Sequence, residues 1–172
     1  MSRAERATKR DPSSPGHAHA DYTGAVYGSM LAASVVIGAG GLGRLPRLQL
    51  MLLLLLTGLV FWVGHVHAQL FGARLAQRPL DRRTILGVCR EEWPIVEAAV
   101  PPAVAVAVSP LLGLDVEGAG WLALAVAVAG QVGWSAVGAR KAGASWPLVT
   151  GTAAINLLLG LAIIAFKLAL TH

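Results

Sequence analysis

Residues 48–73 read LQLMLLLLLTGLVFWVGHVHAQLFGA, a stretch of 26 residues with no aspartate, glutamate, lysine or arginine. An α-helix rises about 1.5 Å per residue, so about 20 residues cross a hydrocarbon core about 30 Å thick. Lipid offers no hydrogen-bond partner to backbone groups that other local structures leave unpaired. This stretch therefore predicts a transmembrane helix.

Four further stretches are similarly apolar, although residues 93–114 include Glu97 and residues 146–168 include Lys167. Only 13% of the 172 residues are charged, whereas soluble globular domains carry about 25%, so an ordinary cytosolic domain is excluded. The gaps between charges predict an all-α, five-helix transmembrane bundle that forms a single domain over residues 22–170. The expected helices cover residues 22–43, 48–73, 93–114, 118–139 and 146–168. Residues 1–21 are charged, contain proline and serine, and are expected to form a disordered cytoplasmic tail.

The distribution of positive charge predicts the orientation of the bundle. With five spans and a cytoplasmic N-terminus, the inside segments hold 11 lysines and arginines and the outside segments hold 3. With four spans the division is 7 to 7, which carries no orientation signal. The positive-inside rule therefore favours a cytoplasmic N-terminus and a C-terminus outside. The basic residues between positions 74 and 90 are expected to contact anionic lipid headgroups at the cytoplasmic face of the bilayer.

The composition also excludes several kinds of partner and cofactor. The net charge of +5 follows from the positive-inside pattern, and no soluble domain with a basic groove is present, so nucleic acid is not expected to bind. A single cysteine, Cys89, excludes an internal disulfide framework and a cysteine-based metal centre. His65 and His67 lie about 200° apart around a helix, so they form no chelate. We expect no metal and no cofactor.

The segment 81–90 joins the second and third expected spans. Ile85, Leu86 and Val88 lie there between arginines, and Asp81 is of a residue type that often caps helix N-termini. One interpretation is a short amphipathic helix on the cytoplasmic face. The other is a simple basic connector, and the sequence favours neither.

Small residues at four-residue spacing predict close contacts between helices, because they let two backbones approach. Three such rows are Gly24, Gly28 and Ala32; Gly64, Ala68 and Gly72; and Ala125, Ala129 and Gly133. We expect these rows to pack inside the bundle rather than to form a dimer face. A homo-oligomer or a partner membrane protein remains open.

Polar side chains within the spans are the candidate functional residues. They are Glu97, His67, His65, Gln69, Gln131 and Asn156. Counted from the cytoplasmic helix ends, these residues lie about 8 to 15 Å deep. The sequence therefore predicts one polar layer in the cytoplasmic half of the bundle. The structural alternative is a set of hydrogen bonds between helices, which contribute about 0.6 kcal/mol each on average.

Glu97 is the strongest candidate in this layer. An acidic residue at a helix centre costs up to about 3 kcal/mol on insertion, so an ionisable residue within a span is a functional candidate. His67 lies at a similar depth on the preceding helix, and we expect it to pair with Glu97. Pro101 and Pro102 lack an N–H, so two carbonyls one turn earlier lose their usual donors. A kinked helix, of the kind that forms transporter sites, is therefore expected here.

A resemblance adds to this interpretation. It rests on the segments FWVGHVHA (61–68) and REEWPIVEAAVPP (90–102), and on a composition with 11 arginines and 3 lysines. In these features residues 22–170 resemble small uncharacterised integral membrane proteins of high-GC Gram-positive bacteria. The resemblance implies a bacterial cytoplasmic membrane as the location and implies no activity.

Three classes of function are consistent with the sequence. A structural or accessory membrane component is favoured, because polar residues within a membrane do not by themselves establish chemistry. Small-ion or proton-coupled transport through the polar layer is the alternative. A membrane enzyme is the least favoured class, since the sequence contains no nucleophile with a base, no metal triad and no glycine-rich phosphate loop.

Cys89 provides a test of the predicted orientation. A membrane-impermeant maleimide should leave it unmodified in intact spheroplasts and should label it in inverted vesicles, because the loop that contains it is expected to be cytoplasmic. The variant Cys89→Ser controls for labelling of other residues. Modification of Cys89 from outside the cell contradicts the orientation.

Overall fold

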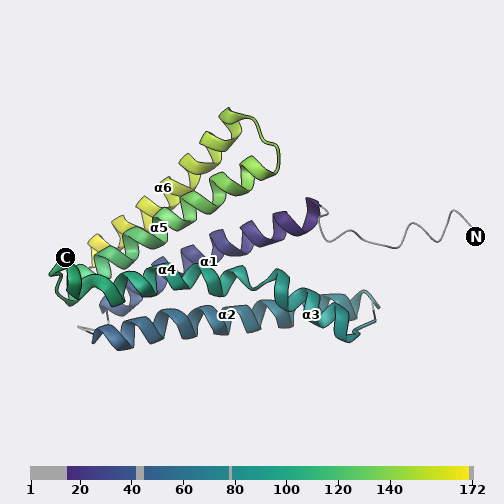
Figure 1. The fold of residues 1–172 in the computed structure, drawn as a ribbon, viewed down its shortest axis with the longest axis horizontal. Helices are drawn as coiled ribbons and strands as arrows, with labels where there is room; N and C mark the ends of the chain where they lie inside the picture. The colour runs from purple at the N-terminus through teal and green to yellow at the C-terminus, as the bar shows by residue number, and fades with distance from the viewer. Residues whose placement is uncertain (1–14, 42–44, 78, 171–172) are drawn as a thin grey trace, which may run out of the picture.

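The structure is a computed structural model that describes residues 15–41, 45–77 and 79–170. Every element in this part of the chain is helical, which confirms the all-α fold class. The elements are α1 (Pro15–Gly41), α2 (Arg47–Leu75), α3 (Arg82–Glu91), α4 (Pro94–Val108), the 3₁₀ helix η2 (Ser109–Leu112), α5 (Val116–Lys141) and α6 (Trp146–Leu170) (Figure 1).

Five segments are long and apolar enough to cross a membrane, as the sequence predicts. They are Tyr22–Gly40, Arg47–Leu75, Arg82–Leu112, Val116–Lys141 and Trp146–Phe166. In the third segment, α4 and η2 contribute 15 and 4 residues, which together extend about 30 Å. α4 and η2 can therefore cross the hydrocarbon core without α3.

Two helix boundaries differ from the expected ones by more than two residues. α1 begins at Pro15, inside the segment predicted to be a tail, and proline is well suited to the first position of a helix. Residues 1–14 of that segment lie outside the described residues. The third span changes from α-helix to 3₁₀ helix at Ser109, because Pro110 has no N–H to donate to the next α-helical hydrogen bond.

The segment between the second and third spans is the short helix α3. Its N-cap is Asp81, whose side chain accepts a hydrogen bond of 2.8 Å from the backbone N–H of Thr84. Hydrogen bonding from Thr84 lowers the pKa of Asp81. None of the residues of α3 is buried, and the helix lies where α2 ends and α4 begins (Figure 1). We call this end of the bundle the α3 end.

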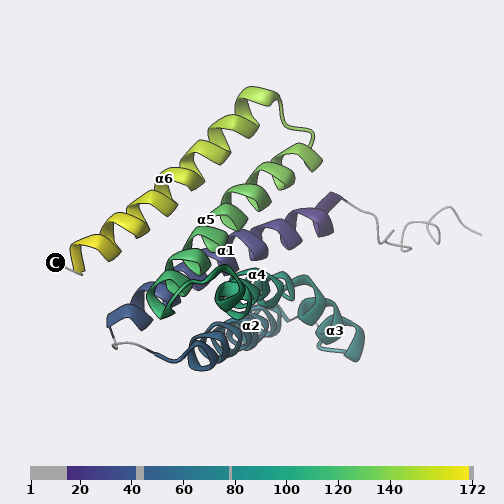
Figure 2. The same ribbon diagram turned by 60° about the vertical axis from the view of Figure 1, so that its left-hand side comes forward.

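The spanning helices are arranged as a fan with α1 in its middle. α2 packs on α4 and α5 packs on α6, while α1 contacts all four and meets α5 and α4 most extensively. Figures 1 and 2 show α5 and α6 tilting away from α2 and α4 toward the α3 end, and all helices converging at the other end. The bundle therefore has a narrow half and a wide half.

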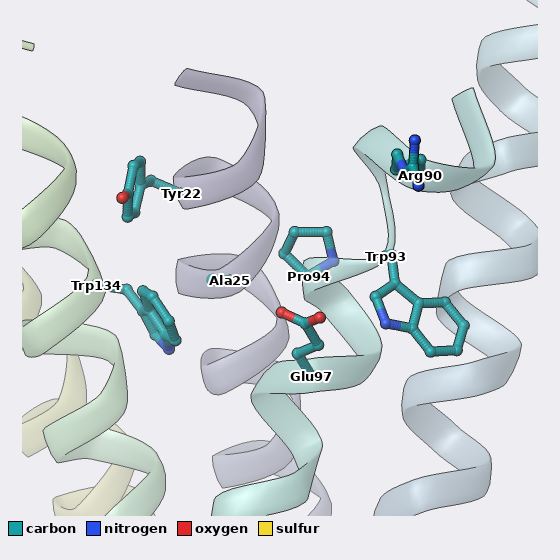
Figure 3. Close-up of a pocket in the computed structure, with 7 residues that line it drawn as sticks. All are labelled: Tyr22, Ala25, Arg90, Trp93, Pro94, Glu97 and Trp134. Atoms are coloured by element: carbon teal, nitrogen blue, oxygen red, sulfur yellow. The ribbon is translucent and has the colours of Figure 1, made fainter. Parts of the chain in front are cut away.

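The apolar core occupies the narrow half. Its buried residues are Ala32, Ala33, Val36, Ala39, Leu50, Leu54, Ala103, Val106, Ala119, Ala123, Leu124, Ala127 and Val128. Most of these side chains are small, so the helix backbones come close together and gain van der Waals contact, which is what holds helices together in lipid. Toward the α3 end, the larger side chains of Tyr22, Trp93 and Trp134 stand between the helices (Figure 3).

Glycines permit two close crossings with α4. A Cβ atom on Gly28 of α1 would lie 2.7 Å from the carbonyl oxygen of Ile95 and 2.9 Å from the Cβ of Ala98. A Cβ atom on Gly58 of α2 would lie 3.0 Å from the Cβ of Ala99. α4 is therefore held between α1 and α2 by contacts that leave no room for a larger side chain.

The three rows of small residues have different locations. The row in α1, Gly24, Gly28 and Ala32, is buried in the bundle as expected. The rows Gly64, Ala68 and Gly72 in α2 and Ala125, Ala129 and Gly133 in α5 are exposed. The expectation of packing inside the bundle is wrong for these two rows, because four-residue spacing identifies one face of a helix but not the neighbour of that face.

Arg47 links the start of α2 to the connection between α4 and α5. Its Nε donates a hydrogen bond of 3.2 Å to Oγ of Ser109, and its Nη2 donates one of 2.6 Å to the carbonyl of Leu114. The hydroxyl of Ser109 donates in turn to the carbonyl of Val106 at 2.8 Å. These bonds stabilise the narrow end, because they pair carbonyls near a helix C-terminus.

The variant Gly28→Ala tests the contact between α1 and α4. The added methyl group is expected to destabilise the protein, because overpacking costs about 1 to 3 kcal/mol and the better helix propensity of alanine returns only about 1 kcal/mol. Thermal unfolding in detergent measures the effect. Gly64→Ala is the matched control, since nothing lies within 4 Å of its added Cβ, and it should keep or raise the Tm. Equal effects of the two variants contradict the close crossing.

Candidate functional site

The candidate polar residues lie in the wide half of the fan, but they do not form one cluster. Gln131 of α5 meets Asn156 of α6, and Gln69 of α2 meets Glu92, the C-cap residue of α3. His65 lies beside α1, His67 is exposed on α2, and Glu97 lines a hollow between α1, α4 and α5. The predicted layer therefore consists of separate sites around α1.

Gln131 and Asn156 join α5 to α6. Nε2 of Gln131 donates to both the backbone carbonyl and Oδ1 of Asn156, each at 3.2 Å. Nδ2 of Asn156 donates to the carbonyl of Thr152 at 3.0 Å in its own helix. Gln131 is fully buried, and its Oε1 has no hydrogen-bond partner among the residues that the structure describes. This arrangement fits the structural alternative, in which amides hold two helices together.

Gln69 and His65 also contact neighbouring helices. Nε2 of Gln69 donates to a carboxylate oxygen of Glu92 at 3.3 Å. Nδ1 of His65 lies 3.0 Å from the carbonyl of Phe61, and the His65 ring centre lies 5.0 Å from that of Tyr27 in α1. Both residues therefore help to hold α2 in place, Gln69 against the end of α3 and His65 against α1.

The structure does not bring Glu97 and His67 together. His67 stacks on Phe71 of its own helix, with ring centres 6.4 Å apart. In the part of the chain that the structure describes, the Glu97 carboxylate forms no hydrogen bond or ion pair. The rotation of α4 explains this separation. Ala99 faces Gly58 of α2, and Glu97 lies about 200° around the helix from Ala99, so it faces away from α2.

Glu97 instead lines a hollow of about 340 Å³ at the α3 end. We call it the Glu97 hollow, and it is lined by Tyr22, Ala25, Arg90, Trp93, Pro94, Glu97 and Trp134. Figure 3 shows the carboxylate of Glu97 directed toward Pro94 and the α1 backbone near Ala25. Trp134 approaches from α5, and Arg90 lies on α3, further toward the end of the bundle.

The residues around Glu97 in this hollow are not grouped by any local pattern in the sequence. Tyr22 comes from α1, Trp134 from α5 and Trp93 from the turn before α4. Tryptophan and tyrosine prefer the membrane interface, and that preference is the signal that points to this end of the bundle. Trp93 is further positioned by Trp62, since their rings meet nearly at right angles with centres 5.4 Å apart.

Two charged side chains of opposite sign line the Glu97 hollow without forming an ion pair. The described residues provide neither Arg90 nor Glu97 with a side-chain hydrogen bond or salt bridge. The backbone carbonyl of Glu97 also lacks its usual helical donor, because Pro101 has no N–H. α4 is continuous through Pro101 and Pro102, and the kink expected there stays a prediction. The Glu97 carboxylate is an acceptor that suits a proton or a cation.

Two further hollows lie beside α1 in the wide half. One, of about 400 Å³, lies between α1, α5 and α6 and reaches Asn156, and the other, of about 360 Å³, lies between α1 and α2 beside His65. Aspartate, glutamate, lysine and arginine are absent from the lining of both. Of these three hollows, the Glu97 hollow is therefore the one that presents such charged groups to a ligand.

Within residues 15–41, 45–77 and 79–170, no three histidine, cysteine, aspartate or glutamate residues are grouped so that they could hold a metal ion. Comparisons with protein-family models, with curated proteins and with solved structures found no match to this chain. The interpretation of the Glu97 hollow therefore depends on its own residues.

A double-mutant cycle tests whether Gln131 and Asn156 act as a structural link. The variants Gln131→Leu and Asn156→Leu, alone and together, should show a coupling free energy of about 0.6 kcal/mol, the average for hydrogen bonds between membrane helices. Reversible unfolding in mixed micelles gives the four stabilities. The expected coupling is small because Oε1 of Gln131 already lacks a partner. A coupling of zero contradicts the link.

Proposed function

We propose that this integral membrane protein takes up a proton or small cation at Glu97 as part of a transport function in the bacterial cytoplasmic membrane. Five helices that can cross a membrane support the location. One observation carries the function: the Glu97 carboxylate has no partner among the described residues, and it lines a hollow of about 340 Å³. Gln131, Asn156 and Gln69, by contrast, are engaged in contacts between helices.

The position of Glu97 supports uptake from the α3 end. Its side chain is exposed and lies in the first turn of α4, next to the surface helix α3. With the N-terminus in the cytoplasm, as the charge distribution favours, this end of the bundle is cytoplasmic. Because the Glu97 side chain is exposed at this end, it can exchange a proton or cation with water.

The narrow half constrains how transport would proceed. The alanine-rich core fills the space between α1, α2, α4 and α5 there, so an ion held at Glu97 faces one side of the membrane. Release to the other side needs a second arrangement in which the narrow half opens, as in carriers that alternate between two states.

A structural or accessory role is the second candidate function. The exposed rows of small residues on α2 and α5 favour it, because Gly64 and Gly133 would admit another helix at close range. Such a contact could join a second copy or a partner membrane protein. Exposed Arg74 and Arg82 near the α3 end additionally support contact with anionic lipid headgroups.

Flux through proteoliposomes tests the transport proposal. We expect the wild-type protein to dissipate an imposed gradient of H⁺, Na⁺ or K⁺, measured with a trapped pH dye or a radioactive tracer. Glu97→Gln should reduce this flux at least about tenfold, because the amide keeps the shape of the carboxyl group but cannot bind a proton or a cation in the same way. Thermal unfolding should show an intact fold.

Glu117→Gln serves as the matched control for this experiment. Glu117 is an exposed residue in the first turn of α5, at the opposite end of the bundle, so its substitution should leave the flux unchanged. Equal flux through wild type and Glu97→Gln contradicts the proposal. If the wild-type protein shows no flux of H⁺, Na⁺ or K⁺, the accessory role is favoured.

A further inference from the structure

The Glu97 hollow has an unusual charge arrangement. It contains one carboxylate, Glu97, and one guanidinium, Arg90, and neither is paired within the described residues. Opposite charges within reach of each other in a membrane protein normally form an ion pair, because each lowers the cost of placing the other near lipid. The two charges in this hollow are instead held apart.

The backbone explains why they stay apart. Arg90 is in the last turn of α3 and Glu97 is in the first turn of α4, and the chain turns between these helices at Trp93 and Pro94. Figure 3 shows Arg90 near the outer end of the hollow and the Glu97 carboxylate further in, below Pro94. A ligand in the hollow therefore meets a positive group first and a negative group deeper.

We infer that the Glu97 hollow binds a zwitterion that carries an ammonium group and a phosphate group, with the ammonium at Glu97 and the phosphate at Arg90. This inference rests on the proposed uptake of a cation at Glu97 and specifies that cation as the ammonium end of a larger molecule. A phospholipid headgroup and a free phosphorylated amino alcohol share this chemistry.

Each end of the hollow matches one end of such a ligand. An ammonium group donates strong, charge-assisted hydrogen bonds to a carboxylate, and the Trp134 ring lines the same hollow. A guanidinium group binds phosphate oxygens through two parallel hydrogen bonds. The volume of about 340 Å³ lies at the lower end of the range for small-molecule sites, about 300 to 1,000 Å³.

The charges around the hollow favour a zwitterion over simpler ions. A small cation at Glu97 leaves the charge of Arg90 unpaired, and a small anion at Arg90 leaves the charge of Glu97 unpaired. α1 contributes Tyr22 and Ala25 to the lining, and α5 contributes Trp134; none of these three is an acidic or basic residue. Lys141 of α5 lies outside the lining, 5.4 Å from the centre of the Tyr22 ring. A molecule with one charge of each sign satisfies both ends at once.

Calorimetric titration of the purified full-length protein in maltoside detergent tests the inference. The probes are O-phosphoethanolamine, ethanolamine and inorganic phosphate, and O-phosphoethanolamine should bind at least about tenfold more tightly than either fragment, because it alone pairs both charges. Dihexanoyl phosphatidylethanolamine and dihexanoyl phosphatidylglycerol form a second pair of probes. They carry the same tails and phosphate, but only the first has an ammonium group.

The two sources of the zwitterion give different results with these probes. Tight binding of O-phosphoethanolamine itself assigns a soluble ligand. Binding of dihexanoyl phosphatidylethanolamine in preference to both O-phosphoethanolamine and dihexanoyl phosphatidylglycerol assigns a lipid headgroup. Both results support the inference. If neither O-phosphoethanolamine nor dihexanoyl phosphatidylethanolamine binds, the inference is overturned.

Substitutions of the two charged residues provide the decisive binding measurements. Arg90→Gln and Glu97→Gln should each weaken binding of the tighter zwitterion about tenfold or more, because each removes one charge-assisted contact. Arg83→Gln on α3 and Glu117→Gln on α5 make the same charge changes outside the hollow, and they should bind as wild type does. The Tm of each variant checks that the fold is retained.

The sign of the Arg90→Gln effect separates this inference from the proposed function. If ethanolamine binds as tightly as O-phosphoethanolamine and Arg90→Gln strengthens the binding of both, the hollow is a plain cation site, and the zwitterion inference is overturned. If the wild type binds no zwitterion but shows flux that depends on Glu97, the zwitterion inference is also overturned, and the proposed function stands without it. Failure of both experiments rejects both proposals.

Discussion

The close crossing of α1 and α4 at Gly28 is the contact on which the rest of the bundle depends. Because Gly28 has no side chain, the α1 backbone reaches the carbonyl of Ile95, and α1 can lie between α4 and α5. Lipid provides no hydrophobic drive for helix association, so such close contacts determine which helices meet. α1 carries Ala32 and Ala33 in the narrow half but Tyr22 and Tyr27 in the wide half, and the neighbouring helices diverge accordingly.

This divergence places the polar residues in two different surroundings. Where α5 and α6 remain close, Gln131 and Asn156 are within hydrogen-bond distance and act as a structural link. Where α1, α4 and α5 separate, the space is lined by aromatic side chains and by the charges of Arg90 and Glu97. The same geometry therefore explains why some polar residues serve the fold and why Glu97 is left available to a ligand.

The candidate residues were found in the sequence more reliably than their partners. Glu97 and Gln131 stand out because a charged or amide group is rare in an apolar stretch, and that contrast is local. Their similar depth in the membrane predicts His67 as the partner of Glu97. In the structure, however, His67 stacks on Phe71, and Glu97 faces away from α2. The depth of a residue in the membrane follows from counting residues along its helix. The neighbour that its side chain faces depends on how the helix is rotated about its axis.

The sequence by itself determined the helical class, the five spans and, through the spacing of charges, the boundaries of each apolar segment. These properties are local, since the length and hydropathy of one segment decide whether it can cross a bilayer. The tertiary structure alone decided which small-residue rows pack inside, and it alone brought Arg90, Trp134 and Glu97 to one hollow. Those outcomes depend on contacts between distant segments, such as Gly28 with Ile95 and Gly58 with Ala99, which set helix rotation and which no single segment encodes.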